Sequence, residues 1–486
     1  MQLRDILKDI KTVKVTADLS LEIKGITQNS KKIEEAFIFA TLKGARFDGN
    51  AFIPNAMDMG AVCVVTDTPP ILDVPYILVE NVRESLSMML SNFYGRPQDS
   101  FKISVGITGT NGKTSTSVML KNIFEEAGMK VGLIGTMKYL IGDEEYDSES
   151  EGNHLTTPDS ENFWSLLAIM RDKGVEALVM EVSSHALELG KIYGMHFTRG
   201  VFTNLTRDHL DFHHDFDNYK KAKAKLFSMC DMGIVNEDDP SSSEMITRAT
   251  CPVKTYSIDR NSSDYTAKNV RLKGALGVEY ELLTKELIFR VKVNIAGRFT
   301  VYNSLAAGVV ALTVGVGYDT IIKGLLSTTR IDGRVDRVDV DAPFSVIIDF
   351  AHTPDAMENV LKTVRGFAEK RIITLFGCGG DRDKTKRPIM GKMSVDMSDF
   401  VIITSDNSRT ENTEDIIKDI VAGIDGKTNF EVVPDRKEAI KRAIDIAEEG
   451  DIVLLLGKGH EEYEIGINGK VPFSEREIVK EYINAK

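Results

Sequence analysis

A glycine-rich segment near residue 110 has the residue types that bind phosphate. Residues 106–114 read GITGTNGKT, after an apolar run and before a helix-like stretch. Gly109 and Gly112 permit tight backbone geometry, so successive N–H groups can point toward phosphate oxygens at a helix N-terminus. Lys113 would then reach the β- and γ-phosphates, and the Thr114 hydroxyl would bind Mg²⁺. The segment therefore predicts a site for ATP with magnesium.

The spacing of this segment differs from the general phosphate-loop pattern. That pattern places a glycine at position 107, where this chain has Ile107. The alternative is a glycine-rich turn that carries a surface lysine. The strand before the turn and the helix after it favour a phosphate loop, because both are needed to aim the backbone N–H groups.

Acidic and imidazole groups follow two further strand-like runs. The run EALVM (176–180) precedes Glu181, and a later run precedes TRDHLD (206–211), which contains His209. A carboxylate at the carboxyl end of a strand, in a sheet that carries a phosphate loop, is well placed to bind Mg²⁺. For His209, a structural histidine is the alternative, and the adjacent aspartates leave the two interpretations balanced.

Four polar segments follow strand-like runs in the last part of the chain. They read DFAH (349–352), GCGGDRDK (377–384), SDNSR (405–409) and GKGHE (457–461). In an open α/β sheet, ligands bind outside the carboxyl ends of the strands. One polar strand end is usually only a loop, but four of them predict a shared crevice.

The charges in this predicted crevice have both signs. Arg382 and Arg409 offer guanidinium groups suited to a carboxylate. Asp406 and Glu461 are suited to an ammonium group. The combination predicts a site for a zwitterionic amino acid.

The elements that must position these residues form three blocks. Their predicted bounds are 1–98, 99–330 and 331–486, and the first block ends near the turn-like residues 95–97. The second block has the strand–loop–helix–strand order of a parallel βαβ unit, and residues 265–296 read as a small antiparallel appendage. In the third block strands alternate with helices. We therefore expect an α/β protein with a small mixed N-terminal domain, a central P-loop-type domain with a mostly parallel sheet, and a C-terminal Rossmann-like, doubly wound domain.

Composition narrows the class of protein. The formal net charge of −13 over 486 residues argues against nucleic-acid binding, because phosphate backbones are held mainly by Lys and Arg. The four cysteines lie far apart, which favours free thiols in a reducing compartment. The chain shows no apolar run long enough for a signal peptide or a membrane span. We expect a cytoplasmic protein, a monomer, with small-molecule partners.

Several of these motifs resemble one enzyme family. TGTNGKT is similar to the shortened phosphate loop of the Mur ligases and of their relative, folylpolyglutamate synthase. EVSSH and NLTRDHLD are similar to other Mur ligase motifs, and DNSR resembles the family signature DNPR. TQNSKK and FIFATLKGARFDG in the first block resemble the family's uridine-nucleotide-binding domain. The resemblance covers nearly the whole chain.

The resemblance implies roles for individual residues. The implied catalytic residues are Lys113, His209 and Lys223. The implied Mg²⁺ ligands are Thr114, Glu181, His209 and Lys223, the last as a carbamate, which turns a cation into an anionic ligand. The residues implied to bind ATP are Gly109, Thr110, Asn111, Gly112, Lys113, Thr114, Asn303, Arg334, Asp349 and His352.

The resemblance also assigns the two other substrates. The residues implied to hold the UDP-sugar-peptide are Ser30, Ala45, Arg46, Phe47, Thr156, Thr157, Ser183 and Lys191. Those implied to hold the amino acid are Arg382, Asp406, Asn407, Ser408, Arg409, Gly457 and Glu461. The three blocks would then bind the uridine nucleotide, ATP and the amino acid, in that order.

The function implied is ATP-dependent ligation through an acyl phosphate. The expected reaction adds meso-2,6-diaminopimelate to UDP-N-acetylmuramoyl-L-alanyl-D-glutamate in peptidoglycan synthesis, because Arg409 suits a second carboxylate on the amino acid. A lysine-adding ligase is the first alternative, and lanthionine would satisfy the same arginine. A folylpolyglutamate synthase would leave the first block without a purpose, and a nucleotide-dependent switch would turn over ATP without an amino acid.

Overall fold

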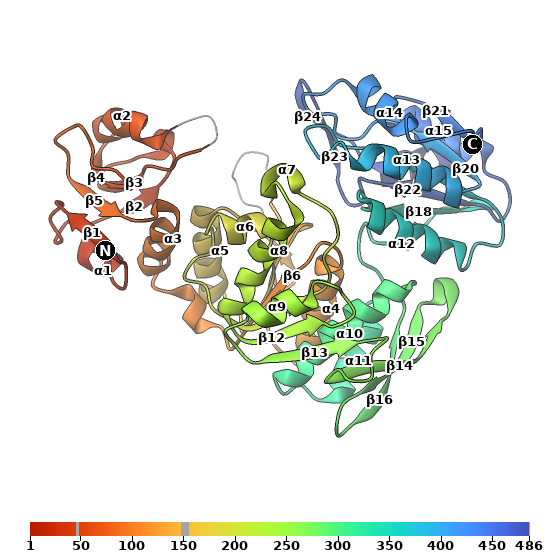
Figure 1. Cartoon of the computed structure of the whole chain (residues 1–486), viewed down its shortest axis with the longest axis horizontal. Coiled ribbons are helices and arrows are strands. Elements are labelled where there is room, and N and C mark those ends of the chain that lie inside the picture. Colours follow the sequence, from red (N-terminus) through yellow and green to blue (C-terminus); the bar gives the residue numbers. More distant parts are fainter. Residues whose placement is uncertain (45–47, 147–154, 486) are drawn as a thin grey trace.

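The computed structural model describes residues 1–44, 48–146 and 155–485. The chain forms three α/β domains in sequence order, and the first and third lie on opposite sides of the central one (Figure 1). This arrangement confirms the predicted fold class.

The N-terminal domain is a small mixed α/β unit. Its sheet has the order β1-β5-β4-β3-β2, and only the pairing of β1 with β5 is antiparallel. The strands are β1 (Thr12–Val15), β2 (Gly25–Thr27), β3 (Phe37–Ala40), β4 (Ala61–Thr66) and β5 (Tyr76–Val79). The helices are α1 (Leu3–Ile6), α2 (Ile53–Asp58) and α3 (Val82–Phe93). Asn81 starts α3 by accepting hydrogen bonds from the N–H groups of Arg83 and Glu84.

The central domain is built on a sheet with the order β16-β15-β14-β13-β12-β11-β6-β10-β7-β8-β9. The pairings from β7 to β14 are parallel, and those at both edges are antiparallel. The strands are β6 (Ile103–Thr108), β7 (Val131–Ile134), β8 (Tyr139–Ile141), β9 (Glu144–Glu145), β10 (Ala177–Glu181), β11 (Phe197–Phe202), β12 (Cys230–Asn236), β13 (Val253–Ser257), β14 (Tyr265–Leu272), β15 (Val278–Leu283) and β16 (Ile288–Val293). The helices are α4 (Lys113–Glu126), α5 (Ser160–Asp172), α6 (Ser184–Glu188), α7 (Leu210–His213), α8 (Phe216–Ala224), α9 (Ser242–Arg248), α10 (Arg298–Thr313) and α11 (Tyr318–Ser327).

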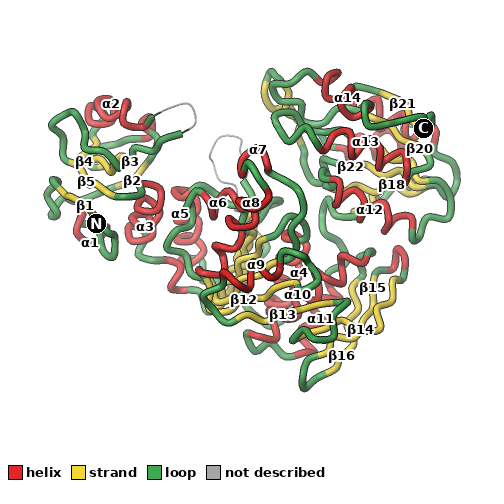
Figure 2. Tube along the Cα trace, viewed as in Figure 1, coloured by secondary structure: helices red, strands yellow, loops and turns green. Residues whose placement is uncertain are grey.

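Helices cover both faces of this sheet (Figure 2). Side chains of β10 alternate between two cores: Ala177 and Val179 face one of them, Leu178 and Met180 the other. The first core also contains α4, α10 and α11, and the second contains α5 and α8. Burial on both faces explains the continuous apolar runs in these strands.

The predicted appendage at 265–296 is part of the main sheet. β14 pairs in parallel with β13, and β15 and β16 then extend the same sheet as antiparallel strands. Ala267 and Tyr280 belong to the core beside α10. These strands are therefore held by the central core and do not form a unit of their own.

The C-terminal domain is the doubly wound unit that the alternating pattern predicts. Its sheet has the order β17-β18-β22-β19-β20-β21, and only β17 is antiparallel. The strands are β17 (Asp336–Val338), β18 (Ser345–Asp349), β19 (Ile372–Phe376), β20 (Phe400–Ile403), β21 (Phe430–Val432) and β22 (Ile452–Leu456), followed by the hairpin of β23 (Tyr463–Gly466) and β24 (Gly469–Pro472). The helices are α12 (Pro354–Arg365), α13 (Lys386–Met397), α14 (Thr413–Val421), α15 (Arg436–Ile446) and α16 (Glu475–Asn484).

The two faces of this sheet have separate cores. Helices α12, α13 and α14 pack on one face, and α15 and α16 pack on the other. Within β22, Leu454 faces the first core and Val453 and Leu455 face the second. Among the described residues, none of the helices is long and apolar enough to span a lipid bilayer.

Candidate active site

The segment between β6 and α4 is a tight glycine loop at a helix N-terminus. Gly109 and Gly112 have φ values of +151° and +86°. A Cβ atom on Gly109 would lie 1.9 Å from Thr203 Oγ1, and one on Gly112 would lie 2.4 Å from Asn303 Oδ1. Only glycine fits either position, so the predicted loop geometry is confirmed. Asn303 lies in α10, where it packs directly against the loop.

Two lysines share one carbonyl oxygen of this loop. Lys113 Nζ donates to Gly109 O and to Thr110 O, both at 3.0 Å. Lys223 Nζ, from α8, donates to the same Gly109 O at 2.8 Å and lies 4.7 Å from the ring centroid of Tyr219. Tyr219 OH is in turn 3.1 Å from Thr110 Oγ1. The predicted catalytic lysines are thus neighbours, although they lie on different helices.

Burial acts strongly on both amino groups. Lys223 is only 2% exposed, and burial together with the charge of Lys113 holds its pKa well below the ordinary value. Burial also lowers the pKa of Lys113. Two ammonium groups on one carbonyl repel each other, which favours a neutral amine at Lys223. A neutral amine is the form that reacts with CO₂, so the environment suits the predicted carbamate.

The predicted metal ligands surround this loop. Glu181 ends β10, is 1% exposed, and accepts hydrogen bonds from the N–H and hydroxyl groups of Thr136. His209 has a left-handed φ of +53°, and its Nε2 lies 3.4 Å from Asp208 Oδ2. Burial lowers the pKa of His209 to about 3, so the ring is neutral at pH 7 and can act as a ligand. Thr114 is also buried.

The residues predicted to hold the UDP-sugar-peptide are spread over the central and N-terminal domains. Thr157 Oγ1 donates to Glu181 O, and Ser183 starts α6. Lys191 forms an ion pair with Asp159 at 2.5 Å. Ser30 lies in the N-terminal domain. The predicted residues Ala45, Arg46 and Phe47 lie outside the described part of the chain.

The C-terminal domain brings its predicted amino-acid residues together at the carboxyl ends of the strands. Arg409 has a φ of +52°, and its Nη1 donates to Gly380 O at 2.8 Å and to Asn407 O at 3.2 Å. Burial lowers the pKa of Arg409, and the nearby Arg382 adds to this effect. A bound anion would offset both the burial of the Arg409 charge and its repulsion by Arg382.

Three of the predicted residues use their side chains in hydrogen bonds within the C-terminal domain. Asn407 uses its side-chain amide within the domain, donating to Glu461 Oε2 at 2.8 Å. Ser408 Oγ lies 2.6 Å from Thr413 Oγ1, so a hydroxyl pair holds the turn. Asp349 is 4% exposed and accepts hydrogen bonds from the N–H groups of Val335 and Ala351. These contacts position the strand ends.

One cavity of about 300 Å³ joins the two halves of the site. It is lined by the phosphate loop and by Thr156, Glu181, Ser183, His209, Lys223, Arg334, His352, Arg382, Asp406, Asn407, Arg409, Gly457 and Glu461. Arg334 Nη2 donates to Thr114 Oγ1 at 3.4 Å across the domain boundary. Gly457 is required here, since its Cβ would lie 2.7 Å from Asp406 Oδ2. The groups predicted to bind phosphate and those predicted to bind the amino acid therefore line the same cavity.

Sequence reasoning missed other groups around this cavity. Thr136 and Tyr219 line it, and so does Lys386, which donates from Nζ to His352 O at 2.8 Å. Burial lowers the pKa of His352 to about 4, and Lys386 contributes to the shift. Lys386 lies two residues beyond the polar segment 377–384, and this closeness is the signal in the sequence that points to it.

Comparison with known proteins agrees with this arrangement. Three family models match the chain: the Mur ligase family catalytic domain over 22–94, the Mur ligase middle domain over 107–311, and the Mur ligase glutamate ligase domain over 333–459. The chain belongs to the Mur ligase family. The order of the matches along this Mur ligase is also the order of its three structural domains.

Individual Mur ligases match over the full length. A UDP-N-acetylmuramoyl-L-alanyl-D-glutamate–2,6-diaminopimelate ligase from Clostridium acetobutylicum is 42% identical over 99% of both chains. The enzyme of that name from Clostridium perfringens is 41% identical over 100% of both chains. A solved structure of a ligase of the same name has a TM-score of 0.71 and 28% identity, and covers 100% of this chain and 99% of that one.

Proposed function

We propose that this Mur ligase adds meso-2,6-diaminopimelate to the γ-carboxyl group of D-glutamate in UDP-N-acetylmuramoyl-L-alanyl-D-glutamate, with ATP as energy source and Mg²⁺ as cofactor. The cavity carries the proposal, because Arg382, Arg409, Asp406 and Glu461 face the phosphate loop across it. The full-length likeness to ligases of that name supports the choice of substrates.

The chemistry follows from joining a carboxylate to an amine in water. A carboxylate is a poor acyl donor, so its oxygen first attacks the γ-phosphorus of ATP, which gives an acyl phosphate and ADP. The amine of the incoming amino acid then attacks the acyl carbon, loses a proton, and expels inorganic phosphate. Lys113 is placed to stabilise negative charge on the transferred phosphoryl group.

The residues present fit a magnesium ion. Mg²⁺ prefers oxygen ligands and usually retains substrate phosphate oxygens and water. Glu181 and Thr114 offer oxygens beside the phosphate loop, His209 offers a neutral nitrogen, and Lys223 would add two oxygens as a carbamate. Among the described residues, no group of three or more His, Cys, Asp or Glu could hold a metal alone. When bound, Mg²⁺ would neutralise charge on the phosphates during transfer.

The second carboxylate of diaminopimelate has a reason to bind at Arg409. Two backbone carbonyls orient the Arg409 guanidinium. The like charge of Arg382 nearby favours the binding of an anion between the two arginines. Lysine has no second carboxylate to pair there. We therefore propose diaminopimelate as the substrate, with a lysine-adding ligase as the alternative.

Phosphate release from ATP tests the proposal. Purified protein, Mg²⁺ and UDP-N-acetylmuramoyl-L-alanyl-D-glutamate are combined with meso-diaminopimelate or with L-lysine. We expect strong stimulation by diaminopimelate alone, and a KM for it about tenfold or more higher in Arg409→Ala, since a charged hydrogen bond is lost. Stimulation by lysine would favour the lysine-adding alternative, and turnover without either amino acid would favour a nucleotide switch.

We further propose that the enzyme acts in the cytoplasm as a monomer on small-molecule substrates. Its four cysteines are free thiols, as expected in a reducing compartment. Light scattering after size-exclusion chromatography tests the monomer; a mass of twice 53.9 kDa would contradict it.

A further inference from the structure

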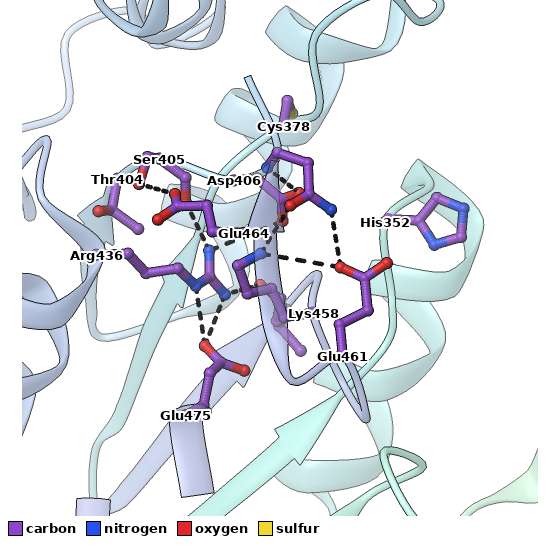
Figure 3. Close-up of polar contacts among 12 residues, drawn as sticks. His352, Cys378, Thr404, Ser405, Asp406, Arg436, Lys458, Glu461, Glu464 and Glu475 are labelled. Carbon is purple, nitrogen blue, oxygen red and sulfur yellow. Dashed lines mark hydrogen bonds and ion pairs between the residues drawn. The ribbon is translucent and has the colours of Figure 1, made fainter. Parts of the chain in front are cut away.

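Two buried cations, Arg436 and Lys458, lie beside the carboxylates of Asp406 and Glu461 in the C-terminal domain (Figure 3). Arg436, the first residue of α15, is 1% exposed, and Lys458, which follows β22, is 0% exposed. Neither is among the described residues that line the cavity. Burial of a cation is costly unless its partners compensate, so the partners indicate what each cation does.

Arg436 joins the ends of two strands. Its Nη1 donates to Ser405 O at 2.8 Å and its Nη2 donates to Leu456 O at 2.7 Å. Ser405 lies just beyond β20 and Leu456 ends β22, and these strands lie on either side of β19. Glu475, 2% exposed at the start of α16, accepts from Arg436 Nε at 2.9 Å. The contacts fix the backbone next to Asp406 on one strand end and next to the 457–461 loop on the other.

Lys458 and the N–H of Ile465, which donates to Asn407 Oδ1 at 2.9 Å, together set the orientation of the Asn407 amide. Lys458 Nζ donates to Asn407 Oδ1 at 3.0 Å and to Tyr463 O at 2.9 Å. Because an ammonium group can only donate, the oxygen of Asn407 must face Lys458. The amide NH₂ then faces Glu461, to which it donates at 2.8 Å. Lys458 Nζ is also 3.8 Å from Glu461 Oε2, so Lys458 acts on this carboxylate both directly and through Asn407.

The same cations favour ionised carboxylates. Burial raises the pKa of Glu461, and Lys458 opposes that rise. Burial would also raise the pKa of Asp406, but Lys458 and Arg436 outweigh it and the pKa is lowered. An ionised pair is the form that attracts an ammonium group.

We propose that Lys458 and Arg436 are positioning residues of the amino-acid site. Arg436 joins the two strand ends, and Lys458 holds Asn407 and Glu461 in the orientation that receives the amino group of the incoming amino acid. The inference rests on the proposed function, because it requires an amino acid as a ligand of this cavity.

The opposite end of the same sheet offers a matched control. Arg371, just before β19, pairs through Nη2 with Asp451 Oδ2 at 2.6 Å, just before β22. Asp451 is 2% exposed. The change Arg371→Met therefore removes a cation from a buried carboxylate at the amino ends of the strands, away from the cavity. It should lower the melting temperature without changing the KM for any substrate.

The test compares steady-state constants of folded variants. Lys458→Met keeps the length of the side chain and removes its charge, and we expect the KM for meso-diaminopimelate to rise about tenfold or more. The KM for ATP should stay unchanged. Arg436→Lys keeps the charge but cannot reach both carbonyls, so it should raise the same KM less. If Lys458→Met does not fold, Lys458→Gln provides a second neutral variant.

Two results would overturn the inference. One is an unchanged KM for diaminopimelate in a folded neutral variant at position 458. The other is an equal rise in Arg371→Met, which would mean that any loss of stability in the domain acts on the site. Wild-type protein that releases no phosphate in response to an amino acid would instead overturn the proposed function, and the inference with it.

Discussion

The two junctions between domains differ in what holds them. At the first, Trp164 of α5 is fully buried, and its Nε1 donates to Ser87 Oγ of α3 at 2.9 Å inside an apolar core shared by both domains. At the second, the contacts are polar: Asn111 Nδ2 donates to Asp355 Oδ2 at 2.8 Å, and Arg334 contacts Thr114. The active-site cavity lies at this second junction.

This difference indicates which domain can move. Separating an apolar core exposes its surface to water, whereas polar contacts can exchange for contacts with water at little cost. We therefore expect the N-terminal domain to stay fixed to the central one and the C-terminal domain to be the one that changes its position. Ligation needs such motion, because ATP and the amino acid enter a site formed by two domains and water must then be excluded.

Removal of the shared tryptophan should have the largest effect. Trp164→Ala leaves a cavity in the first junction, and we expect the unfolding free energy to fall by about 3–5 kcal/mol. Urea denaturation followed by circular dichroism measures the loss. A loss below about 1 kcal/mol would show that the first junction is no stronger than the second.

Loss of the hydrogen bond between Trp164 and Ser87 should lower the unfolding free energy by a smaller amount. Ser87→Ala leaves the Trp164 indole and Tyr193 O, to which Ser87 donates at 2.8 Å, without this partner. We expect a loss of about 1–3 kcal/mol for unpaired buried groups. Trp164 is the only tryptophan in the chain, so its fluorescence can report unfolding at this junction. Ser228→Ala, at an exposed serine, is the control and should change little.

A carboxyl group makes the first junction sensitive to pH. Glu161 accepts from Gln28 N–H at 2.7 Å across the junction, and burial raises its pKa above the ordinary value of 4.5. The ionised form is thus disfavoured in the folded protein, so this contribution to stability falls as pH rises from 4.5 through the raised pKa. Glu161→Gln should remove this fall. If the unfolding free energies of the wild-type protein and of Glu161→Gln depended equally on pH from 4.5 to neutral pH, that would contradict the assignment.

The smallest effect on stability is expected at the second junction. Asp355→Asn keeps an oxygen that can accept from Asn111, and we expect the unfolding free energy to change by less than about 1 kcal/mol. We expect Asp355→Asn to affect the kcat for ligation more than it affects stability, because the contact joins the two domains that move relative to each other. Denaturation and steady-state assays on one preparation measure both. A stability loss as large as that of Trp164→Ala would make this junction as rigid as the first.

The phosphate loop and the four strand ends could be predicted from sequence because their chemistry is local. The role of a glycine in a phosphate loop, or of a polar segment at a strand end, can be recognised from the few residues on either side of it. The supports could not be predicted: Arg436 looks like an ordinary surface cation until the fold buries it, and Lys458 belongs to the predicted segment 457–461 but is buried instead of lining the cavity. The inward direction of Asn407 depends in the same way on a partner 51 residues away.

The strands at the edge of the central sheet are a second case in which contacts distant in sequence decide the structure. The predicted antiparallel strands in 265–296 correspond to β15 and β16, but β14 was not predicted, and the membership of all three in the main sheet depends on packing against α10.

The shared core at the first junction has a consequence for how the chain matures. That core draws on residues from Leu3 to Met245, so the N-terminal domain cannot complete it until the ribosome has released about half of the protein. The two cores of the C-terminal sheet use residues from Val335 onward, and they can form last as a separate cooperative unit. The three domains should therefore denature in two transitions, with the first two domains unfolding together.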